Sequence, residues 1–505
     1  MVIGLDIGTS GARALALNES GEVVAEATQG YPLLSPRPAW TEQNPEDWWL
    51  ASRKVLFEVA AKAKAKINSK IDGIGLTGQM HGSVFLDASD QVIRPALLWN
   101  DQRTASQCIE ITDRVGRERL LEIAGNPALT GFQAPKLLWL REAEPANYKR
   151  IAHVLLPKDF IRLRLTGEYA TDASDASGTL LLDLRRRAWS AEILEALELP
   201  RTWLPAVYEG PDETGRLRAD VSADLGLPAG IPIAAGGGDN AAAAVGSGIV
   251  EAGLASSSIG TSGVLFTHTP QFTPDPSGRL HAFCHAVPGA YHLMGVTLSA
   301  GGSLQWWRQV LGGQHEYDAL IELAESAPVG AEGLLFLPYL SGERTPHLDA
   351  SARGAFFGLT ARHGLNHLTR AVMEGVAYSL ADCLQVMIEL GVGVSQVRAL
   401  GGGARSRLWR QIQADVYGLP VHRTTVDEGP AYGAALLAGV TAGHFKSVDE
   451  ACSVVRLRPD VAEPNPESAQ LYKRYLQIYR DLYPATAGAM ARLSDLAAAA
   501  NQDMS

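Results

Sequence analysis

Two identical pentapeptides, Ile7-Gly8-Thr9-Ser10-Gly11 and Ile259-Gly260-Thr261-Ser262-Gly263, decide the fold of this 505-residue chain. The second copy begins half a chain after the first, and each copy follows a short extended segment and precedes another. The same pentapeptide in the same local context indicates an internal repeat. We therefore predict two related domains, each opening with a strand, a glycine turn and a second strand, with a boundary near residues 245–255.

Around the repeat, short apolar runs that end in glycine turns alternate with longer amphipathic stretches, a pattern typical of an α/β fold. The chain opens as an antiparallel meander of strand, turn, strand, turn and strand. The expected strands cover residues 2–5, 12–17, 71–76, 231–235 and 397–400, and the expected helices cover residues 45–65, 370–384 and 465–485.

The composition limits the classes of function. An apolar fraction of 46% and a charged fraction of 20% are those of a globular protein, which excludes disorder. The formal charge of −11 argues against sequence-independent nucleic-acid binding, which needs a basic surface. The four cysteines lack Cys-x-x-Cys spacing, which indicates inert thiols. Because the N-terminus has no basic segment and no run of 18 apolar residues occurs, we expect a cytoplasmic protein without a membrane span.

The two Gly-Thr-Ser turns carry groups that bind phosphate. Glycine lets the backbone approach a ligand, successive N–H groups form an anion nest, and the hydroxyls donate to phosphate oxygens. Two such turns, at residues 8–10 and 260–262, would hold a polyphosphate. Asp6 precedes the first turn where Ser258 precedes the second, and a carboxylate beside phosphates suits Mg²⁺. The alternative interpretation is a pair of ordinary hairpin turns.

A third glycine-rich turn, Gly401-Gly402-Gly403, follows a predicted strand. It is not a Walker A loop, because no Gly-Lys-Ser/Thr follows, and Ser406 stands where the last glycine of Gly-x-Gly-x-x-Gly belongs. Together with the phosphate turns it would seat the base and ribose of a nucleotide, and a plain helix entry is the alternative. None of the three turns supplies the fingerprint of a nicotinamide dehydrogenase, which excludes that class.

Asp239 is the candidate general base. Three glycines precede it, and Asn240 and a run of alanines follow, so it lies at a predicted strand end with room for a substrate. Ligand contacts in open α/β sheets usually lie at such strand ends. A carboxylate there accepts the proton of a sugar hydroxyl as that hydroxyl attacks a phosphoryl group. The alternative is an aspartate that caps the following helix.

Two further stretches suit a polyol ligand. Gln79, Met80 and His81 combine hydrogen-bonding groups with a thioether surface in a turn of small residues. Trp99 and Asp101 place an aromatic ring beside a polar run. Structural roles are the alternative, because a histidine outside a metal cluster is more often structural and a tryptophan often belongs to the core.

Together these motifs resemble those of the FGGY carbohydrate kinases, of the actin–hexokinase–Hsp70 superfamily, over roughly residues 1–440. Residues 6–11 and 258–263 are similar to the family's two phosphate motifs, and residues 401–405 to its adenosine motif. Residues 358–359 with 367–374 fit its C-terminal signature. Gln133 departs from the N-terminal signature, which usually has a small hydroxyl residue or proline there.

The resemblance implies an α/β fold of two duplicated actin-like (ribonuclease H-like) ATPase domains with an interdomain cleft, over residues 1–248 and 249–450, followed by a helical segment and tail over 451–505. It implies that Asp239 is the catalytic base and that Asp6, also catalytic, holds Mg²⁺ through water. The implied sugar contacts are Gln79, Met80, His81, Trp99, Asp101 and Asn240. The implied ATP contacts are Gly8, Thr9, Ser10, Arg13, Gly260, Thr261, Ser262, Gly401, Gly402, Gly403, Ala404 and Arg405.

The implied reaction is ATP-dependent phosphorylation of the terminal hydroxyl of D-xylulose, a step of xylose catabolism. Met80-His81 favours this ketose, because glycerol kinases of the family carry Arg-Glu in the same loop. The alternatives are L-xylulose, D-ribulose or a deoxy sugar as substrate, or a non-catalytic actin-like nucleotide-binding protein. We expect the sugar and MgATP as ligands, with neither nucleic acid nor membrane as a partner, and a homodimer stays open.

Overall fold

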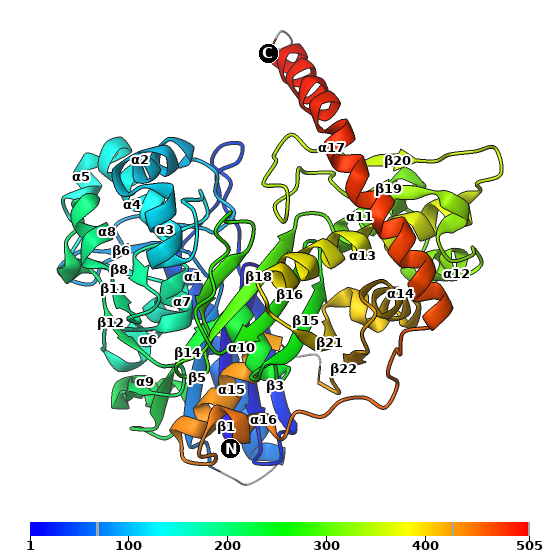
Figure 1. The fold of residues 1–505 in the computed structure, drawn as a ribbon. Helices are drawn as coiled ribbons and strands as arrows, with labels where there is room; N and C mark the ends of the chain where they lie inside the picture. Colours follow the sequence, from blue (N-terminus) through cyan, green and yellow to red (C-terminus); the bar gives the residue numbers. More distant parts are fainter. Residues whose placement is uncertain (67–69, 427–428, 503–505) are drawn as a thin grey trace. The chain divides into compact units, whose positions relative to one another are not determined.

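A computed structural model of the chain describes residues 1–66, 70–426 and 429–502, without the side chains of 498–502 (Figure 1). The chain divides into two compact units, each described here by itself. Unit 1 contains Met1–Glu251, His268–His292 and Glu428–Arg456, and unit 2 contains Ala252–Thr267, Leu293–Asp427 and Leu457–Ser505. Each unit is assembled from segments that are distant in the sequence. The domain boundaries expected after residues 248 and 450 refer to the repeat in the sequence, and they stay predictions.

The main sheet of unit 1 has the strand order β13-β14-β5-β1-β2-β3. The first pentapeptide joins β1 to β2 as an antiparallel hairpin, and β5 runs parallel to both β1 and β14. The predicted opening meander and the strands expected at residues 71–76 and 231–235 are confirmed. The strands are β1 (Val2–Ile7), β2 (Gly11–Leu17), β3 (Val23–Gly30), β5 (Gly73–Gly78), β13 (Glu213–Arg216) and β14 (Pro232–Gly238).

A second sheet repeats this topology, with the order β17-β18-β16-β15-β21-β22. The second pentapeptide joins β15 to β16 as an antiparallel hairpin, and β21 runs parallel to both β15 and β22. The same order of hairpin and parallel strands in both sheets confirms the predicted duplicated α/β fold. The strands are β15 (Gly253–Ile259), β16 (Gly263–Thr269), β17 (His281–Cys284), β18 (Tyr291–Thr297), β21 (Val394–Leu400) and β22 (Val421–Arg423).

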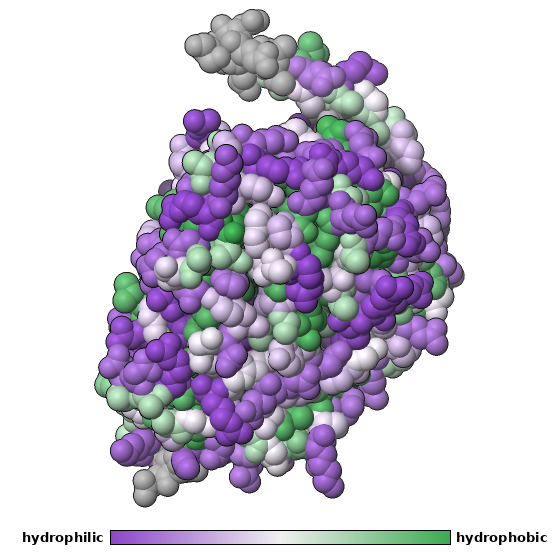
Figure 2. Space-filling view, turned by 90° about the vertical axis from the view of Figure 1, so that its left-hand side faces the viewer, coloured by the Kyte–Doolittle hydropathy of each residue, from purple (hydrophilic) through white to green (hydrophobic). Residues whose placement is uncertain are grey.

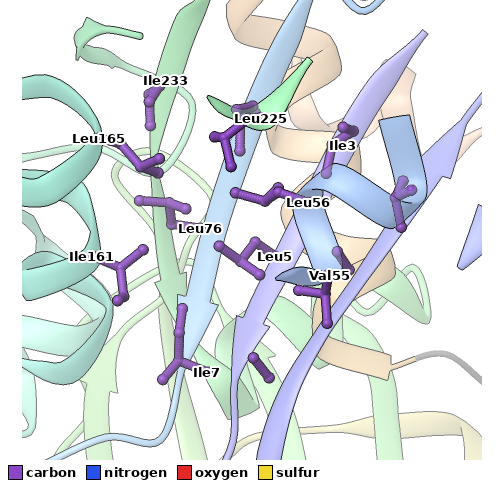
Figure 3. Packing of buried hydrophobic residues seen from close by; sticks show 14 of the residues in the cluster. Ile3, Leu5, Ile7, Val55, Leu56, Leu76, Ile161, Leu165, Leu225 and Ile233 are labelled. Carbon is purple, nitrogen blue, oxygen red and sulfur yellow. The ribbon is translucent and has the colours of Figure 1, made fainter. Parts of the chain in front are cut away.

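Helices α1 (Pro45–Lys66) and α6 (Pro157–Thr166) cover one face of the unit 1 sheet. Alternate residues of β1, namely Ile3, Leu5 and Ile7, project to this face and are fully buried. Figure 3 shows them beside Leu56 of α1 and Ile161 of α6. Burying large aliphatic side chains contributes about 1.5–3 kcal/mol each, so this cluster fixes β1 in the centre of the sheet.

Helix α15 (Gly429–Thr441) covers the opposite face of the same sheet. A Cβ at Gly4 would lie 1.9 Å from the Ala431 carbonyl oxygen, and one at Gly75 would lie 1.8 Å from that of Ala434. Only glycine allows this approach, which explains the small residues of β1 and β5. Because side chains alternate along a strand, Asp6 projects to the same face as Gly4, away from the aliphatic cluster.

Helix α10 (Asp239–Gly246) packs against α15 and β14, and most of the other elements of unit 1 lie outside this sheet. On the face that carries α2, α5 and α8, hydrophilic side chains surround smaller hydrophobic areas (Figure 2). Its other strands are β4 (Glu42–Gln43), β6 (Val84–Leu86), β7 (Ala96–Leu97), β8 (His153–Leu155), β9 (Ala170–Asp172), β10 (Leu182–Asp183), β11 (Ala188–Trp189) and β12 (Ala206–Tyr208). Its other helices are α2 (Ala105–Val115), α3 (Arg117–Ala124), α4 (Gln133–Ala143), α5 (Pro145–Tyr148), α7 (Ala173–Ser177), α8 (Ala191–Ala196), α9 (Ala219–Leu225), α10 (Asp239–Gly246) and α16 (Val448–Cys452).

Unit 2 is built around α13 (Leu365–Glu389), which confirms the helix expected at residues 370–384. Among the described residues α13 is the one helix long and apolar enough to cross a bilayer, and 89% of its most apolar stretch is buried, as in a core helix. The helix expected at residues 465–485 is longer, because α17 continues through Pro484 to Gln502. The other elements are α11 (Gly301–Val310), α12 (Tyr317–Glu325), α14 (Arg407–Tyr417), β19 (Leu335–Leu337) and β20 (Ala355–Phe357).

Candidate active site

Three neighbouring strands of unit 1 bring the predicted catalytic residues to one sheet edge. Strands β14, β5 and β1 are adjacent and parallel, so their carboxyl ends meet. Asp239 follows β14, residues 79–82 (the sugar turn) follow β5, and residues 8–11 (the first phosphate turn) follow β1. Open α/β sheets place their ligands at this edge.

Asp239 is the first residue of α10, and the N-cap of that helix is Gly238, so the capping alternative is wrong. Its Oδ1 accepts hydrogen bonds from the Asn240 N–H, at 2.7 Å, and from Asn240 Nδ2, at 2.9 Å. No donor within residues 1–66, 70–426 and 429–502 is bonded to Oδ2. Burial raises the pKa of Asp239 to about 6, against the hydrogen bonds from Asn240, which lower it. Asn240 therefore orients the carboxylate and leaves Oδ2 for a substrate.

Asp6 carries a buried Oδ1 atom that has no hydrogen-bond partner in the described part of the chain. Burial, and next the negative charge of Asp239, raise the pKa of Asp6 to about 7, whereas Arg13 lowers it. The guanidinium of Arg13, an expected phosphate ligand, donates to Glu26 Oε2 at 2.7 Å.

The buried Oδ1 atom of Asp6, which lacks a hydrogen-bond partner in the ranges that the structure describes, suits a cation or a water molecule that is bound to a cation. Within the residues the structure covers, no group of three or more His, Cys, Asp or Glu side chains could hold a metal by itself. Mg²⁺ binds through one or two carboxylates, waters and substrate phosphates, so the Asp6 carboxylate is of the ligand type that the predicted Mg²⁺ site needs.

The sugar turn places Met80 against Gly238, the residue before Asp239, and His81 against Gly178. Met80 is buried against the catalytic strand end, where a Cβ on Gly238 would lie 2.8 Å from the Met80 Cγ atom. His81 has a φ of 68°, and its Nδ1 lies 2.6 Å from the Gly178 carbonyl oxygen. Because a carbonyl oxygen only accepts, Nδ1 carries the proton and donates to the Gly178 carbonyl oxygen.

Gln79 and Trp99 bond to the first phosphate turn. The Thr9 hydroxyl donates to Gln79 Oε1 at 3.2 Å and accepts from the Trp99 indole N–H at 3.0 Å. A hydroxyl has one proton, and here it points to Gln79. The Gly8 N–H donates to the Gly11 carbonyl oxygen at 3.1 Å, so the groups of the turn that suit phosphate are the remaining backbone N–H groups and Ser10, which is exposed. The sugar contacts expected of Gln79 and Trp99 stay predictions.

Asp101 is fully buried, and its carboxylate is occupied by protein donors. Its Oδ2 accepts from the Thr41 N–H and from Arg103 Nη2, both at 2.7 Å, and Oδ1 accepts from the Arg103 N–H at 3.0 Å. Such a carboxylate supports the loop that carries Trp99. Direct sugar contact by Asp101 stays a prediction.

Two residues of α4 that were not among the predicted site residues hold the sugar turn. Gln133 Nε2 donates to the Gly82 carbonyl oxygen at 3.1 Å, and Lys136 Nζ donates to the His81 carbonyl oxygen at 2.7 Å. Both side chains are buried, and burial lowers the pKa of Lys136 to about 7. Gln133, which departs from the family signature, thus fastens the turn through its amide. Polar residues within the apolar stretch 132–140 are the sequence signal for this role.

Unit 2 holds the second phosphate turn (residues 260–262) in a pocket of about 470 Å³. Of the predicted nucleotide contacts, Gly260, Thr261, Gly402, Gly403 and Arg405 line this pocket, whereas Ser262, Gly401 and Ala404 do not. The other lining residues are Ile259, Gly301, Leu304, Gln305, Tyr317, Asp318, Ile321, Ser406 and Trp409. Apolar walls with a few polar groups are typical of a small-molecule site, and this pocket has the composition a nucleotide needs.

The backbone of α11 holds the second phosphate turn. The Gly260 carbonyl oxygen accepts from the Gly301 N–H at 2.7 Å, and the Thr261 carbonyl oxygen accepts from the Gly302 N–H at 3.0 Å. A Cβ at Gly301 would lie 2.4 Å from the Gly260 oxygen. A Cβ at Gly402 would meet nothing within 4 Å, so this position opens toward the pocket.

Two sheets of one topology, each with a Gly-Thr-Ser turn, and acidic residues at one strand edge are the architecture of a carbohydrate kinase. The chain belongs to the FGGY family of carbohydrate kinases. The family's N-terminal domain matches residues 1–246, and its C-terminal domain matches residues 255–442.

Several xylulose kinases are similar to the chain over nearly its full length. It is 46% identical over 484 residues to a xylulose kinase of Escherichia coli (strain K12). The aligned region covers 96% of this chain and 98% of that relative. It is 41% identical over 486 residues to a xylulose kinase of Bacillus subtilis (strain 168), at 96% and 97% coverage. The solved structure of a xyloylose kinase from Brucella ovis superimposes with a TM-score of 0.92 at 40% identity, covering 96% of this chain and 99% of that chain.

Proposed function

We propose that this protein transfers the γ-phosphoryl group of ATP to the O5 hydroxyl of D-xylulose. The observation that carries the proposal is the meeting of Asp239, the sugar turn and the first phosphate turn at one sheet edge. The identity of 46% to a xylulose kinase supports the substrate. The expected ligands are the sugar and MgATP, and the expected location is the cytoplasm.

Asp239 acts as the general base in this proposal. Oδ2 accepts the O5 proton while O5 forms its bond to the γ-phosphorus and the bond from that phosphorus to the ADP oxygen breaks. The proton then resides on Asp239, and ADP is the leaving group. With a pKa of about 6, the carboxylate is mostly ionised at pH 7 and ready to accept it.

The first phosphate turn and Asp6 stabilise the transferring group. Mg²⁺ would be held at Asp6 through water and would neutralise charge on the phosphate oxygens. Backbone N–H groups of the turn donate to the same oxygens, which favours the charge distribution of the transition state. The pocket of unit 2 binds the nucleotide, with Gly402 in open space and Trp409 in its wall.

His81 and Met80 select the sugar. In this proposal the His81 ring, held by its bond to the Gly178 carbonyl oxygen, contacts a sugar hydroxyl, and the Met80 thioether contacts the sugar carbons. An Arg-Glu pair at the positions of Met80 and His81, as in the glycerol kinases of the family, would favour a different polyol.

The test is a coupled ADP-release assay with MgATP and D-xylulose, L-xylulose, D-ribulose, L-ribulose, glycerol, gluconate or no sugar. We expect kcat/KM for D-xylulose to exceed the other values by at least ~10-fold, the size of one or two hydroxyl contacts. A preference for another sugar would overturn the roles of Met80 and His81. ATP turnover that ignores every sugar would favour the non-catalytic alternative.

A further inference from the structure

Gln43, which belongs to none of the predicted motifs, is almost fully buried in β4 at 1% exposure. Its Nε2 donates to the Thr9 carbonyl oxygen at 2.7 Å and to the Pro32 carbonyl oxygen at 3.4 Å. Its Oε1 accepts from Gln79 Nε2 at 2.9 Å and from the Trp48 indole N–H at 3.0 Å. Two donors and two acceptor positions are the full capacity of an amide, so every one is used.

Three residues, Gln43, Thr9 and Gln79, form a closed ring of hydrogen bonds. Gln43 donates to the Thr9 carbonyl, the Thr9 hydroxyl donates to Gln79, and Gln79 donates to Gln43. The Thr9 carbonyl can only accept, so Gln43 must present its NH₂ group there and its oxygen to Gln79. Gln79 must then present its NH₂ group to Gln43 and its oxygen to Thr9, so the Thr9 hydroxyl proton points to Gln79. Each bond of the ring therefore supports the other two.

The ring joins the two turns that carry the reacting groups. Thr9 lies in the first phosphate turn, and Gln79 is the first residue of the sugar turn. Tyr31 and Trp99 also bond to the phosphate turn, through the Gly8 carbonyl and the Thr9 hydroxyl, but neither is bonded to Gln79. Gln43 is the side chain that bonds to the Thr9 backbone and to Gln79 at once.

We propose that Gln43 is a positioning residue that sets the separation between the first phosphate turn and the sugar turn. This inference rests on the proposed function, because it assigns the two turns to the phosphoryl group and the sugar. A misplacement of about 1 Å costs roughly 10²-fold in rate when the reacting atoms must lie ~3–3.5 Å apart. A shift between the turns therefore changes the rate of transfer more than the binding of either substrate.

Two substitutions break the ring in different ways. Gln43→Glu keeps an acceptor for Gln79 and Trp48 but sets a carboxylate oxygen against the Thr9 carbonyl oxygen. Gln43→Met keeps the volume and removes every polar atom. For both we expect kcat to fall at least ~10-fold, with KM for sugar and for ATP within ~3-fold of wild type.

A matched control separates positioning from stability. Gln107 is also a buried glutamine of unit 1, at 3% exposure, and its Nε2 donates to Glu142 Oε2 at 2.7 Å. Gln107→Met should lower Tm by less than Gln43→Met, because the Gln107 amide has one bond, to the exposed Glu142, whereas Gln43 has four. Its kcat should stay within ~2-fold of wild type.

The assay is steady-state ADP release with both substrates varied, at a temperature where circular dichroism shows each variant folded. A kcat within ~2-fold of wild type in both Gln43 variants would overturn the proposal, as would an equal kcat loss in Gln107→Met. If the wild-type protein releases no ADP in response to sugar, the proposed function fails first and the inference fails with it. If wild type responds and His81→Ala raises the sugar KM while the Gln43 variants keep their kcat, the inference alone fails.

Discussion

The two phosphate turns have the same residues but different supports. Side chains hold the first turn: Tyr31 donates to the Gly8 carbonyl, Gln43 to the Thr9 carbonyl and Trp99 to the Thr9 hydroxyl. The backbone of α11 holds the second turn through its first N–H groups. The hairpins also differ, because Ile7 pairs with Ala12 whereas Ile259 pairs with Gly263, which makes the second loop one residue shorter.

The difference teaches that one pentapeptide can serve two tasks when its neighbours differ. A turn that is held by side chains can also be bonded to the sugar turn, as the first phosphate turn is through the Thr9–Gln79 hydrogen bond. A turn fastened by a helix N-terminus is held by the backbone alone, because the Gly301 and Gly302 N–H groups donate to the carbonyl oxygens of the second turn. The preceding residue completes the contrast, since Asp6 supplies a carboxylate where Ser258 supplies a hydroxyl.

The largest expected effect tests the preceding residues. Asp6→Asn should lower kcat by at least ~10²-fold, because the amide cannot supply the charge that holds Mg²⁺ near the phosphates. Ser258→Ala should stay within ~3-fold, since the hydroxyl carries no charge. Steady-state kinetics and a magnesium titration followed by intrinsic fluorescence measure both. Equal losses in the two variants would remove the contrast.

The second prediction concerns the helix that supports the second turn. Gly301→Ala places a Cβ 2.4 Å from the Gly260 oxygen, and overpacking of this kind costs about 1–3 kcal/mol. We expect KM for ATP to rise ~10-fold while KM for the sugar stays unchanged. Gly393→Ala is the control, because a Cβ there meets nothing within 4 Å. A rise in the sugar KM as well would show that the second turn is not specific to the nucleotide.

The third prediction is a pH dependence of kcat/KM, which we assign to Asp239, a residue of the same sheet edge as the first phosphate turn. Because Asp239 must be ionised and its pKa lies at about 6, kcat/KM should fall ~5-fold between pH 6 and pH 5. The pKa of Asp239 in the folded state exceeds the ordinary aspartate value of 3.8, so the folded state binds more protons than the unfolded state between pH 3.8 and about 6. The contribution of this group to stability therefore decreases as pH rises through that window. A profile that stays flat to pH 4.5 would exclude Asp239 as the base.

A smaller effect is expected from one support of the first turn. Trp99→Phe removes the indole N–H that donates to the Thr9 hydroxyl but keeps an aromatic ring. A neutral hydrogen bond contributes about 1 kcal/mol, so kcat should fall ~5-fold. Rapid-quench measurement of the phosphoryl-transfer step is the direct assay. An increase in the sugar KM without a change in kcat would instead support the predicted sugar contact of Trp99.

The smallest effect is expected at Gln133. Gln133→Ser restores the residue type usual in the family and removes the donor to the Gly82 carbonyl. The sugar KM should rise ~3-fold, and Tm should fall slightly, because the carbonyl oxygens of Gly82 and Leu155 lose this donor. Kinetics with D-xylulose and thermal unfolding measure both quantities. An unchanged sugar KM would assign Gln133 to packing alone.

Much of the fold was predictable because it depends on local pattern. The repeated pentapeptide, with apolar strands around it, indicated two related domains, and the strand-end position of Asp239 indicated a ligand site. The register of the two hairpins was not predictable, since identical residues adopt different loop lengths under different tertiary support. The length of α17 was also underestimated, because Pro484 in its interior argues for an earlier end.

The supporting residues were harder to predict because they act across long sequence separations. Gln43 and Tyr31 reach the first phosphate turn from β4 and from the residue after β3, and no motif marks them. Asp101 lies in a polar run that suits a polyol, yet the neighbouring Arg103 occupies its carboxylate. Only the folded arrangement shows which polar groups already have partners.

The close contact of Gly4 and Gly75 with α15 has a consequence for synthesis of the chain on the ribosome. The strand that carries Asp6 is among the first residues made, whereas the helix that covers it begins at residue 429. At roughly 5–20 residues per second, the sheet waits tens of seconds for this cover. During that time one face of the nascent sheet is open to chaperones and to aggregation, and a fragment that ends before α15 would keep it open.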